Sequence, residues 1–298
     1  MWNRRRFIAA SIATTMRSFA AAPSTANPLL IDSHVHVWKH DPAFPFAPGS
    51  HPPAEDASAE TLLSLMQANG VARTVLIQVI HYRWDNRYLA SVLKHYPGKF
   101  HAVCRVDPED PAAPDHLTQL AQQGFHGVRL SPAATAEGDW IRGPLMQPLW
   151  RRCAELKVPM TILAPVTRLP DLIPLIERNP RLVVVIDHMA DCPLDRPDQL
   201  QMLLVLARYP RVFVKISHIW SLSRRPFPYR DADTQVKRLY DTFGPKRLMW
   251  GTDWPISLKQ LSYDQAVALY RDHLDFIPAK DHEQILSKTV QEVWPFGL

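Results

Sequence analysis

Short apolar runs rich in β-branched residues alternate with amphipathic segments along this chain, and the alternation repeats eight times. The runs are almost continuously apolar, which is typical of parallel strands that are covered on both faces. They predict strands over Leu29–Val37, Thr74–Ile80, Phe100–Val106, Gly127–Ser131, Pro159–Leu163, Leu182–Ile186, Val212–Ser217 and Arg247–Gly251. Apolar residues recur every three or four positions between these runs. This spacing predicts helices, among them Ala59–Asn69, Asp115–Gln123, Met146–Leu156, Gln199–Tyr209 and Thr234–Phe243.

Eight strand–helix units in roughly 270 residues match the size of a TIM barrel. The sequence therefore predicts an α/β protein with one domain, a (β/α)8 barrel over residues 27–298. A C-terminal helix over residues 279–295 is additional to the eight units, and we expect it on the outside of the barrel. The proline-rich segment Asp41–Pro53 is expected to be a long loop whose Phe44 and Phe46 suit a lid over the barrel mouth. A doubly wound open sheet is the alternative fold, but no GxGxxG turn follows a strand.

The first 26 residues resemble an export signal more than part of a fold. Residues 3–9 hold three arginines, the third of which stands at the spacer position before a phenylalanine, and a mildly apolar stretch follows. This pattern predicts a twin-arginine signal peptide with a small-residue cleavage site at Ser24–Ala26, and therefore a periplasmic location. Arg17 interrupts the apolar stretch and departs from the pattern. The alternative is a cytoplasmic protein whose first 26 residues are a disordered start.

The net charge of +5 does not indicate a nucleic-acid partner. Four arginines lie in the first 26 residues, which contain no acid, and without them the net charge is +1. The rest of the chain has no long basic run with interleaved aromatic residues, and no apolar run is long enough to span a bilayer. The expected partner is a small-molecule substrate, and the sequence carries no signal for a particular number of subunits. Three cysteines form no CxxC pair and are expected to be small buried residues; they are Cys104, Cys153 and Cys192.

Two histidines and an aspartate are predicted to meet at the barrel mouth. Side chains two residues apart in a strand share a face, so Asp32, His34 and His36 are expected to point the same way at the end of the first strand. That end of a TIM barrel carries the chemistry. Barrel closure makes the eighth strand the neighbour of the first, so Asp253 is expected beside both histidines. A carboxylate in this position is a candidate general base or metal ligand.

Three further polar residues, Arg129, His188 and Lys215, lie in or directly after strands that are otherwise apolar. Because an unpaired buried charge is costly, a cation there should face the site or pair with an acid. We interpret His188 as a site residue and Arg129 as a substrate-binding residue, with a structural ion pair as the alternative. Both roles remain open for Lys215. The other strand-end and loop histidines are interpreted as structural; they are His81, His126 and His218.

The segments Ile31–Trp38 (IDSHVHVW), Val185–Met189 (VIDHM) and Trp250–Pro255 (WGTDWP) resemble the amidohydrolase-related family of the amidohydrolase superfamily. Within that family the chain is most similar to the lactonase branch, which includes 2-pyrone-4,6-dicarboxylate lactonase, L-fuconolactonase and L-rhamnonolactonase. The resemblance covers nearly everything from Leu29 to Phe296. It implies catalytic roles for Asp253 and His188. It also implies three substrate-binding residues, which are Arg129, Lys215 and Trp254.

Two departures from the superfamily pattern bear on the metal. Members with two metals use a bridging lysine or glutamate on strand 4 and a histidine on strand 5. Here strand 4 offers Arg129, and residues 160–165 of strand 5 contain no histidine. The resemblance therefore implies either no metal or one divalent ion, with zinc expected, on His34, His36 and Asp253.

The implied reaction is hydrolysis of a lactone of the sugar-acid or dicarboxylate type. Asp253 would activate water for attack on the ring carbonyl, and the histidines would stabilise the oxyanion. A zinc-dependent decarboxylase of the same superfamily is the alternative, and the missing histidine on strand 5 counts against it. A third hypothesis is an exported binding protein without activity. Retention of the two first-strand histidines together with His188 and Asp253 counts against that hypothesis.

Overall fold

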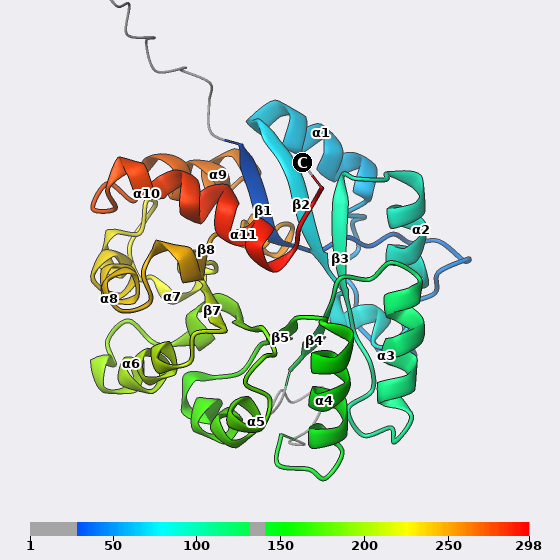
Figure 1. Ribbon diagram of the computed structural model, residues 1–298. Helices are drawn as coiled ribbons and strands as arrows, with labels where there is room; N and C mark the ends of the chain where they lie inside the picture. Colours follow the sequence, from blue (N-terminus) through cyan, green and yellow to red (C-terminus); the bar gives the residue numbers. More distant parts are fainter. Residues whose placement is uncertain (1–28, 132–140, 298) are drawn as a thin grey trace, which may run out of the picture.

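The computed structural model describes residues 29–131 and 141–297. Its centre is one sheet of eight parallel strands in the order β1 to β8 (Figure 1). The strands are β1 (Leu30–Val35), β2 (Val71–Ile77), β3 (Phe100–Cys104), β4 (Gly127–Leu130), β5 (Met160–Ile162), β6 (Val184–Ile186), β7 (Val212–Lys215) and β8 (Leu248–Met249). Seven of them lie within the predicted bounds, and β2 begins three residues earlier than predicted. The predicted barrel is confirmed, whereas the signal peptide lies outside the described residues and stays a prediction.

Hydrogen bonds beyond the end of β8 bring the two edges of the sheet together into a nearly closed barrel. The His36 N–H donates to the Trp254 carbonyl at 2.7 Å, and the Asp253 N–H donates to the His34 carbonyl at 2.9 Å. Gly251 permits this approach, because a Cβ at its position would lie only 2.7 Å from the Cβ of His34. The last strand can therefore reach the first only because residue 251 has no side chain.

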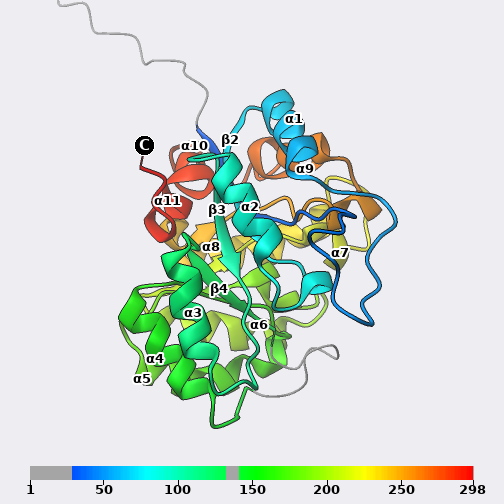
Figure 2. The ribbon, with the colours of Figure 1, turned by 90° about the vertical axis from the view of Figure 1, so that its right-hand side faces the viewer.

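Helices cover the outer face of the barrel (Figures 1 and 2). The helices of the described ranges are α1 (Ala59–Asn69), α2 (Arg87–His95), α3 (Ala113–Gln122), α4 (Met146–Leu156), α5 (Ile173–Arg178), α6 (Pro197–Leu204), α7 (Ile219–Leu222), α8 (Asp233–Phe243), α9 (Tyr263–Asp272), α10 (Ala279–Glu283) and α11 (Thr289–Val293), the last of which lies at one end of the barrel. The bounds of α1 and α4 agree with the prediction at both ends. α1 begins after Ser58, whose side chain accepts from the Thr61 N–H, and ends at Gly70 in the left-handed conformation. Across the described ranges, no helix combines the length and apolar character needed to cross a membrane.

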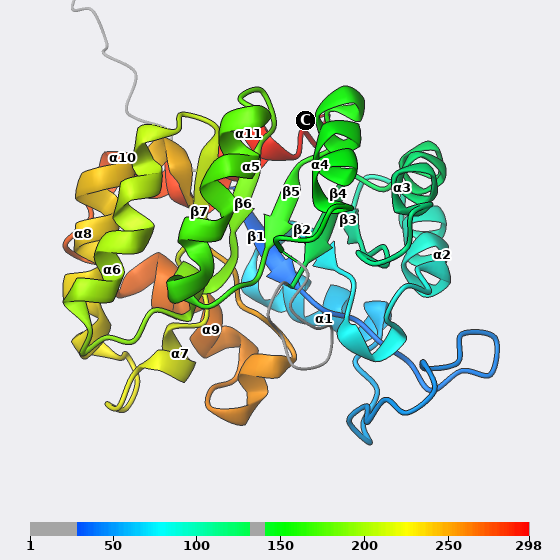
Figure 3. The same ribbon diagram turned by 90° about the horizontal axis from the view of Figure 1, so that it is seen from below.

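From the sequence we expected the C-terminal segment to pack on the outside of the barrel. Instead, it packs across the N-terminal end of the barrel. Figure 3 shows α11 at the end opposite to the loops that follow the strands. Trp294 and Phe296 share one buried cluster with the inward-facing strand residues Ile31, Val75 and Met249. These strand residues would otherwise face water at the open end of the barrel. The C-terminal segment therefore closes the bottom of the barrel interior.

The long loop after β1 does not close over the barrel mouth. The ring of Phe46 stacks on Tyr82 with centroids 4.7 Å apart, and the ring of Phe44 packs against Tyr88 at 5.5 Å. Neither phenylalanine lines the cavity at the mouth. Both rings anchor the loop beside the residues that follow β2, and the loop projects from the barrel end (Figure 2). The expected lid is therefore not formed.

Candidate active site

A cavity of about 230 Å³ opens at the C-terminal ends of the strands, where barrel enzymes place their chemistry. Each of the eight strands is followed by at least one residue that lines it. The arrangement lets side chains that are far apart in the sequence converge on a small volume. The charged and imidazole side chains of this lining that carry the argument below are His36, Arg105, Arg129, His188, His218 and Asp253.

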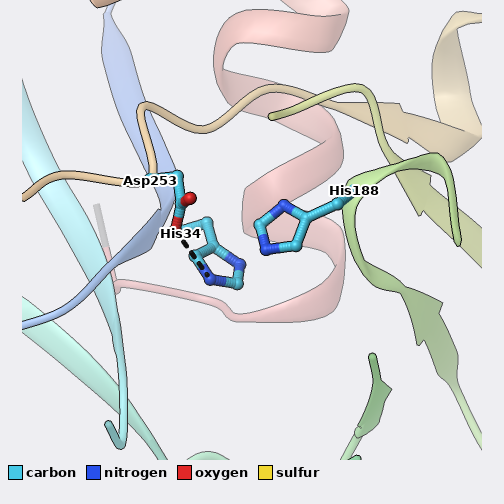
Figure 4. Close-up of side chains that lie close together, drawn as sticks. All are labelled: His34, His188 and Asp253. Carbon is cyan, nitrogen blue, oxygen red and sulfur yellow. Dashed lines mark ion pairs between the residues drawn. The ribbon is translucent and has the colours of Figure 1, made fainter. Parts of the chain in front are cut away.

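The side chains of His34, His36 and Asp253 lie next to one another, as predicted. The two Nε2 atoms of the histidines are 3.2 Å apart. Oδ1 of Asp253 lies 3.6 Å from Nε2 of His34 and 3.5 Å from Nε2 of His36. His188 faces this group from the end of β6 (Figure 4), with its ring centroid 4.4 Å from that of His34. Four side chains from three strands therefore form one cluster.

Asp32 does not join this cluster, although two-residue alternation predicts that it should. Its carboxylate accepts hydrogen bonds from the Thr252 hydroxyl at 2.6 Å and from the backbone N–H groups of Thr252 and His34 at 3.1 and 3.0 Å. The pairing of β1 with β2 shifts its register between Asp32 and Val35. A bulge of this kind breaks the alternation of faces. Asp32 therefore braces the junction of β1 with the residues after β8.

The residues that present the site have unusual backbone geometry. His188, His218 and Asp253 have φ angles of 53°, 68° and 57°, and all four residues from 188 to 191 are in the left-handed region. This region costs a non-glycine residue about 1–2 kcal/mol, so the surrounding packing must hold each one in place. Strain of this kind clusters at functional sites. Here it turns His188 toward the cavity, where its Nδ1 lies 2.8 Å from Oγ of Ser217.

A second buried acid, Asp187, pairs with two cationic side chains beneath the cavity, Arg129 and Lys215. Its Oδ2 accepts a hydrogen bond from Nε of Arg129 at 2.9 Å, and its Oδ1 lies 3.1 Å from Nζ of Lys215 and 3.3 Å from Nδ1 of His34. Burial alone would raise the pKa of this carboxyl. The neighbouring cations, Lys215 first among them, outweigh burial and hold the pKa well below its usual range. Asp187 is therefore ionised and is the partner that both cations require.

Of the three residues expected to bind substrate, only Arg129 lines the cavity. Lys215 is 0% exposed, and its Nζ contacts Nδ1 of His34 at 3.1 Å. Trp254 is 2% exposed, and its indole lines a separate groove beside Trp38. The structure thus corrects the expected positions of Lys215 and Trp254, which support the site from behind. Whether a strand residue faces the cavity or lies beneath it depends on barrel geometry that the sequence pattern does not contain.

Burial and charge determine the protonation states in the cluster. Burial would raise the pKa of Asp253, but the neighbouring histidines, His188 first among them, outweigh it and hold the pKa well below its usual range. Burial lowers the pKa of His34 to about 3 and holds the pKa of His188 well below its ordinary value. Near neutral pH an ionised carboxylate therefore lies beside neutral imidazoles. The lowered pKa keeps the carboxylate ionised and able to accept a proton, while making it a weaker base than a free aspartate. An imidazole N–H beside it can bind an oxyanion, so the site holds the groups that attack by water requires.

Comparison with known proteins places this geometry in a family. Residues 31–296 match the amidohydrolase family. The chain belongs to that family. An L-fucono-1,5-lactonase of Burkholderia ambifaria is 30% identical over 233 residues, which are 76% of this chain and 80% of that protein. A 2-pyrone-4,6-dicarboxylate hydrolase of Comamonas testosteroni is 28% identical over 264 residues, 83% of this chain and 82% of that protein.

A solved structure shares the fold of this amidohydrolase. It is an amidohydrolase of Burkholderia multivorans with bound zinc, 23% identical, with a TM-score of 0.69. The alignment covers 89% of this chain and 98% of that one. It confirms the predicted barrel, and the family match confirms the predicted superfamily. This amidohydrolase is accordingly a hydrolase, and its relatives include enzymes that act on lactones.

The ligand set of this amidohydrolase fits one zinc ion in kind and in separation. Tetrahedral ligands about 2.0–2.2 Å from zinc lie roughly 3.4 Å from one another. The separations of 3.2, 3.5 and 3.6 Å among the nitrogens of His34 and His36 and Oδ1 of Asp253 agree with this value. Ligand atoms of His34, His188 and Asp253 also lie within 4.8 Å of one another. The described part of the chain contains no other group of three histidine, cysteine or acidic side chains so arranged.

Several residues of this site were missed by the sequence interpretation. Asp187 was missed although it directly follows an apolar strand, and its lone charge there was the available signal. His218, interpreted as structural, lines the cavity; its Nδ1 lies 3.1 Å from Asp191, and its Nε2 lies 3.8 Å from Oδ2 of Asp253. Arg105 lines the cavity from the end of β3. His218 and Asp191 lie in loops, where no periodic pattern marks them.

Proposed function

We propose that this amidohydrolase opens a lactone ring by attack of water assisted by Asp253. The observation that carries the proposal is the ionised Asp253 carboxylate at the barrel mouth, with imidazole nitrogens of His34, His36 and His218 between 3.5 and 3.8 Å from its oxygens. The names of the relatives, an L-fucono-1,5-lactonase and a 2-pyrone-4,6-dicarboxylate hydrolase, support a lactone as the substrate class.

In the proposed reaction, Asp253 accepts a proton from water while the water oxygen attacks the ring carbonyl. The carbonyl oxygen becomes an oxyanion, which N–H groups of the cavity wall stabilise. His188 is the first such donor, because its ring lines the cavity while its Nδ1 is tied to Ser217. Collapse of the intermediate breaks the ring C–O bond, and Asp253 returns its proton to the leaving oxygen.

Arg129 indicates that the proposed substrate is negatively charged. Its Nε is bonded to Asp187, and its guanidinium also lines the cavity. Two parallel N–H groups of a guanidinium match the geometry of a carboxylate. We therefore propose a lactone derived from a dicarboxylate or a sugar acid, bound with its acidic group toward Arg129.

At most one divalent metal is compatible with this site. Zinc held by His34, His36 and Asp253 would supply a Lewis acid for the substrate carbonyl. The zinc in the Burkholderia multivorans structure supports the choice of ion. A second ion has no histidine on β5 to hold it, and Arg129 stands where a bridging ligand would be needed.

The test is a hydrolysis screen of sugar-acid and dicarboxylate lactones, run with and without a chelator. Asp253→Asn should lower the rate by roughly 10²–10⁴-fold while the circular dichroism spectrum stays that of the wild type. A variant that keeps more than about a tenth of the wild-type rate would show that another residue activates the water. Release of carbon dioxide from an aromatic acid, with no lactone opened, would favour the decarboxylase alternative.

A further inference from the structure

The two carboxylate oxygens of Asp253 face different partners. Oδ1 lies 3.6 and 3.5 Å from the Nε2 atoms of His34 and His36. Oδ2 lies 3.8 Å from Nε2 of His218, which lines the cavity from the residues after β7. This separation is too long for a direct hydrogen bond, and polar atoms so placed can share a bridging water. Two atoms 3.8 Å apart can both lie about 2.8 Å from one water oxygen placed to the side of the line that joins them.

A second acid, Asp191, holds the ring of His218 in place. Nδ1 of His218 lies 3.1 Å from Oδ1 of Asp191, in the loop after β6. A carboxylate oxygen only accepts, so this contact uses the Nδ1–H of the ring and leaves Nε2 for the cavity. The ring also meets that of Trp220 edge-on, with centroids 4.5 Å apart. An imidazole that is fixed in this way presents the same nitrogen, Nε2, to the carboxylate of Asp253.

Both residues of this pair have an unusual backbone conformation. The φ angles of Asp191 and His218 are 46° and 68°, in the left-handed region that few residue types other than glycine adopt. The Asp191 side chain is 39% exposed, and exposed ion pairs contribute roughly 0–1 kcal/mol to stability. A contribution of this size does not exceed the roughly 1–2 kcal/mol that each left-handed residue costs. The pair therefore indicates a role in function more than in stability.

We propose that His218 is a positioning residue that holds the attacking water against Oδ2 of Asp253. This role rests on the proposed hydrolysis, in which Asp253 is the base. A water held by both side chains keeps its remaining side open to the cavity, where the ring carbonyl would lie. As the water oxygen bonds to the carbonyl carbon, one of its O–H bonds breaks and the proton passes to Oδ2. Misplacement of a reacting group by about 1 Å can cost roughly 10²-fold in rate, so a second contact on the water matters.

Two substitutions of His218 separate this role from a structural one. His218→Asn keeps an amide at the place of Nδ1 and suits a left-handed φ, but it has no atom at the place of Nε2. We expect its kcat to fall about 10–100-fold with KM unchanged. His218→Gln, whose amide reaches the place of Nε2, should recover most of the lost rate. His40→Asn is the matched control with wild-type kcat, because His40 forms a similar pair with Asp56 at 2.7 Å but does not line the cavity.

The kinetic outcomes distinguish this role from the proposed hydrolysis itself. Wild-type kcat in His218→Asn, with Asp253→Asn inactive, would overturn the role of His218 and leave the hydrolysis standing. Equal losses of kcat in His218→Asn and His218→Gln would also overturn it, because Nε2 would then not be the atom that matters.

A crystal structure of the protein gives a second readout that needs no lactone. We expect a water within about 3.2 Å of both Oδ2 of Asp253 and Nε2 of His218 in the wild type. In crystals of His218→Asn this water should be displaced or lost. Direct contact between the two wild-type side chains, or a wild-type cavity with no water at this position, would overturn the proposal even if the wild type opened no lactone. A water that kept its place in His218→Asn would overturn it too.

Discussion

Trp294→Ala should destabilise the protein strongly, because this indole closes the bottom of the barrel. The side chain is 1% exposed, and loss of a buried tryptophan costs about 3–5 kcal/mol. Its Nε1–H donates to the His126 carbonyl at 3.1 Å, and its ring lies 5.3 Å from the Lys215 ammonium. A desolvated cation–π contact contributes about 1–2 kcal/mol. Because such contributions are not additive, we expect a loss of about 4–6 kcal/mol.

Urea unfolding followed by far-ultraviolet circular dichroism measures this loss. Trp294→Phe is the matched control, because it keeps an aromatic ring against Lys215 and removes only the N–H donor and part of the volume. It should cost about 1–2 kcal/mol, the range for one lost hydrogen bond to a buried group. A loss below about 1.5 kcal/mol for Trp294→Ala would refute the view that the C-terminal segment closes the core. Equal losses in the two variants would assign the effect to the hydrogen bond instead of packing.

Three further changes test particular contacts. Arg129→Met should weaken binding of a carboxylated lactone by about 2–5 kcal/mol, seen as a higher KM, and affect its methyl ester much less; equal effects would make Arg129 structural. Burial, with the His101 ring 3.6 Å away, lowers the pKa of His126 to about 4 from an ordinary 6.5. The unfolded chain therefore binds more protons in that window, and stability should fall by about 1–2 kcal/mol between pH 6.5 and 4, allowing for partial exposure. Urea midpoints should vary less with pH in His126→Gln, and an unchanged pH dependence would exclude this residue as the cause. Gly251→Ala should cost about 1–3 kcal/mol and lower kcat, since its Cβ would meet His34; wild-type kinetics would show that the junction adjusts.

The barrel could be predicted because each strand–helix unit carries its own local pattern. The ends of α1 are set by Ser58 and Gly70, which are adjacent to it in sequence. Local residues of this kind are sufficient to predict where an element begins and ends. The meeting of His34 and Asp253 needed one further step, barrel closure, which follows from the number and order of the strands and requires no side-chain detail.

Contacts between distant strands could not be predicted in the same way. Asp187 joins Arg129 and Lys215 from three different strands, and this depends on which face each side chain takes in the closed barrel. The bulge in β1 reverses the expected face of Asp32 without any change in the apolar pattern. The C-terminal segment shows the same limit. Its amphipathic pattern indicates a buried face but does not specify which surface covers it.

The polarity of the cavity gives a bound substrate a preferred direction. Arg105 and Arg129 follow β3 and β4, whereas Asp253 follows β8, which is across the eight-stranded barrel from β4. Burial and the nearby Arg129 lower the pKa of Arg105 to about 9, so the Arg105 guanidinium is still charged near neutral pH. A cavity of about 230 Å³ is smaller than the roughly 300–1,000 Å³ typical of pockets for drug-sized ligands, which favours a single ring. The proposed substrate, a compact lactone with its own carboxylate, would satisfy volume, charge and direction together, because its acid would meet the cations while its ring carbonyl reached the base. A neutral cyclic amide of the same size would use only the side of the cavity that carries Asp253.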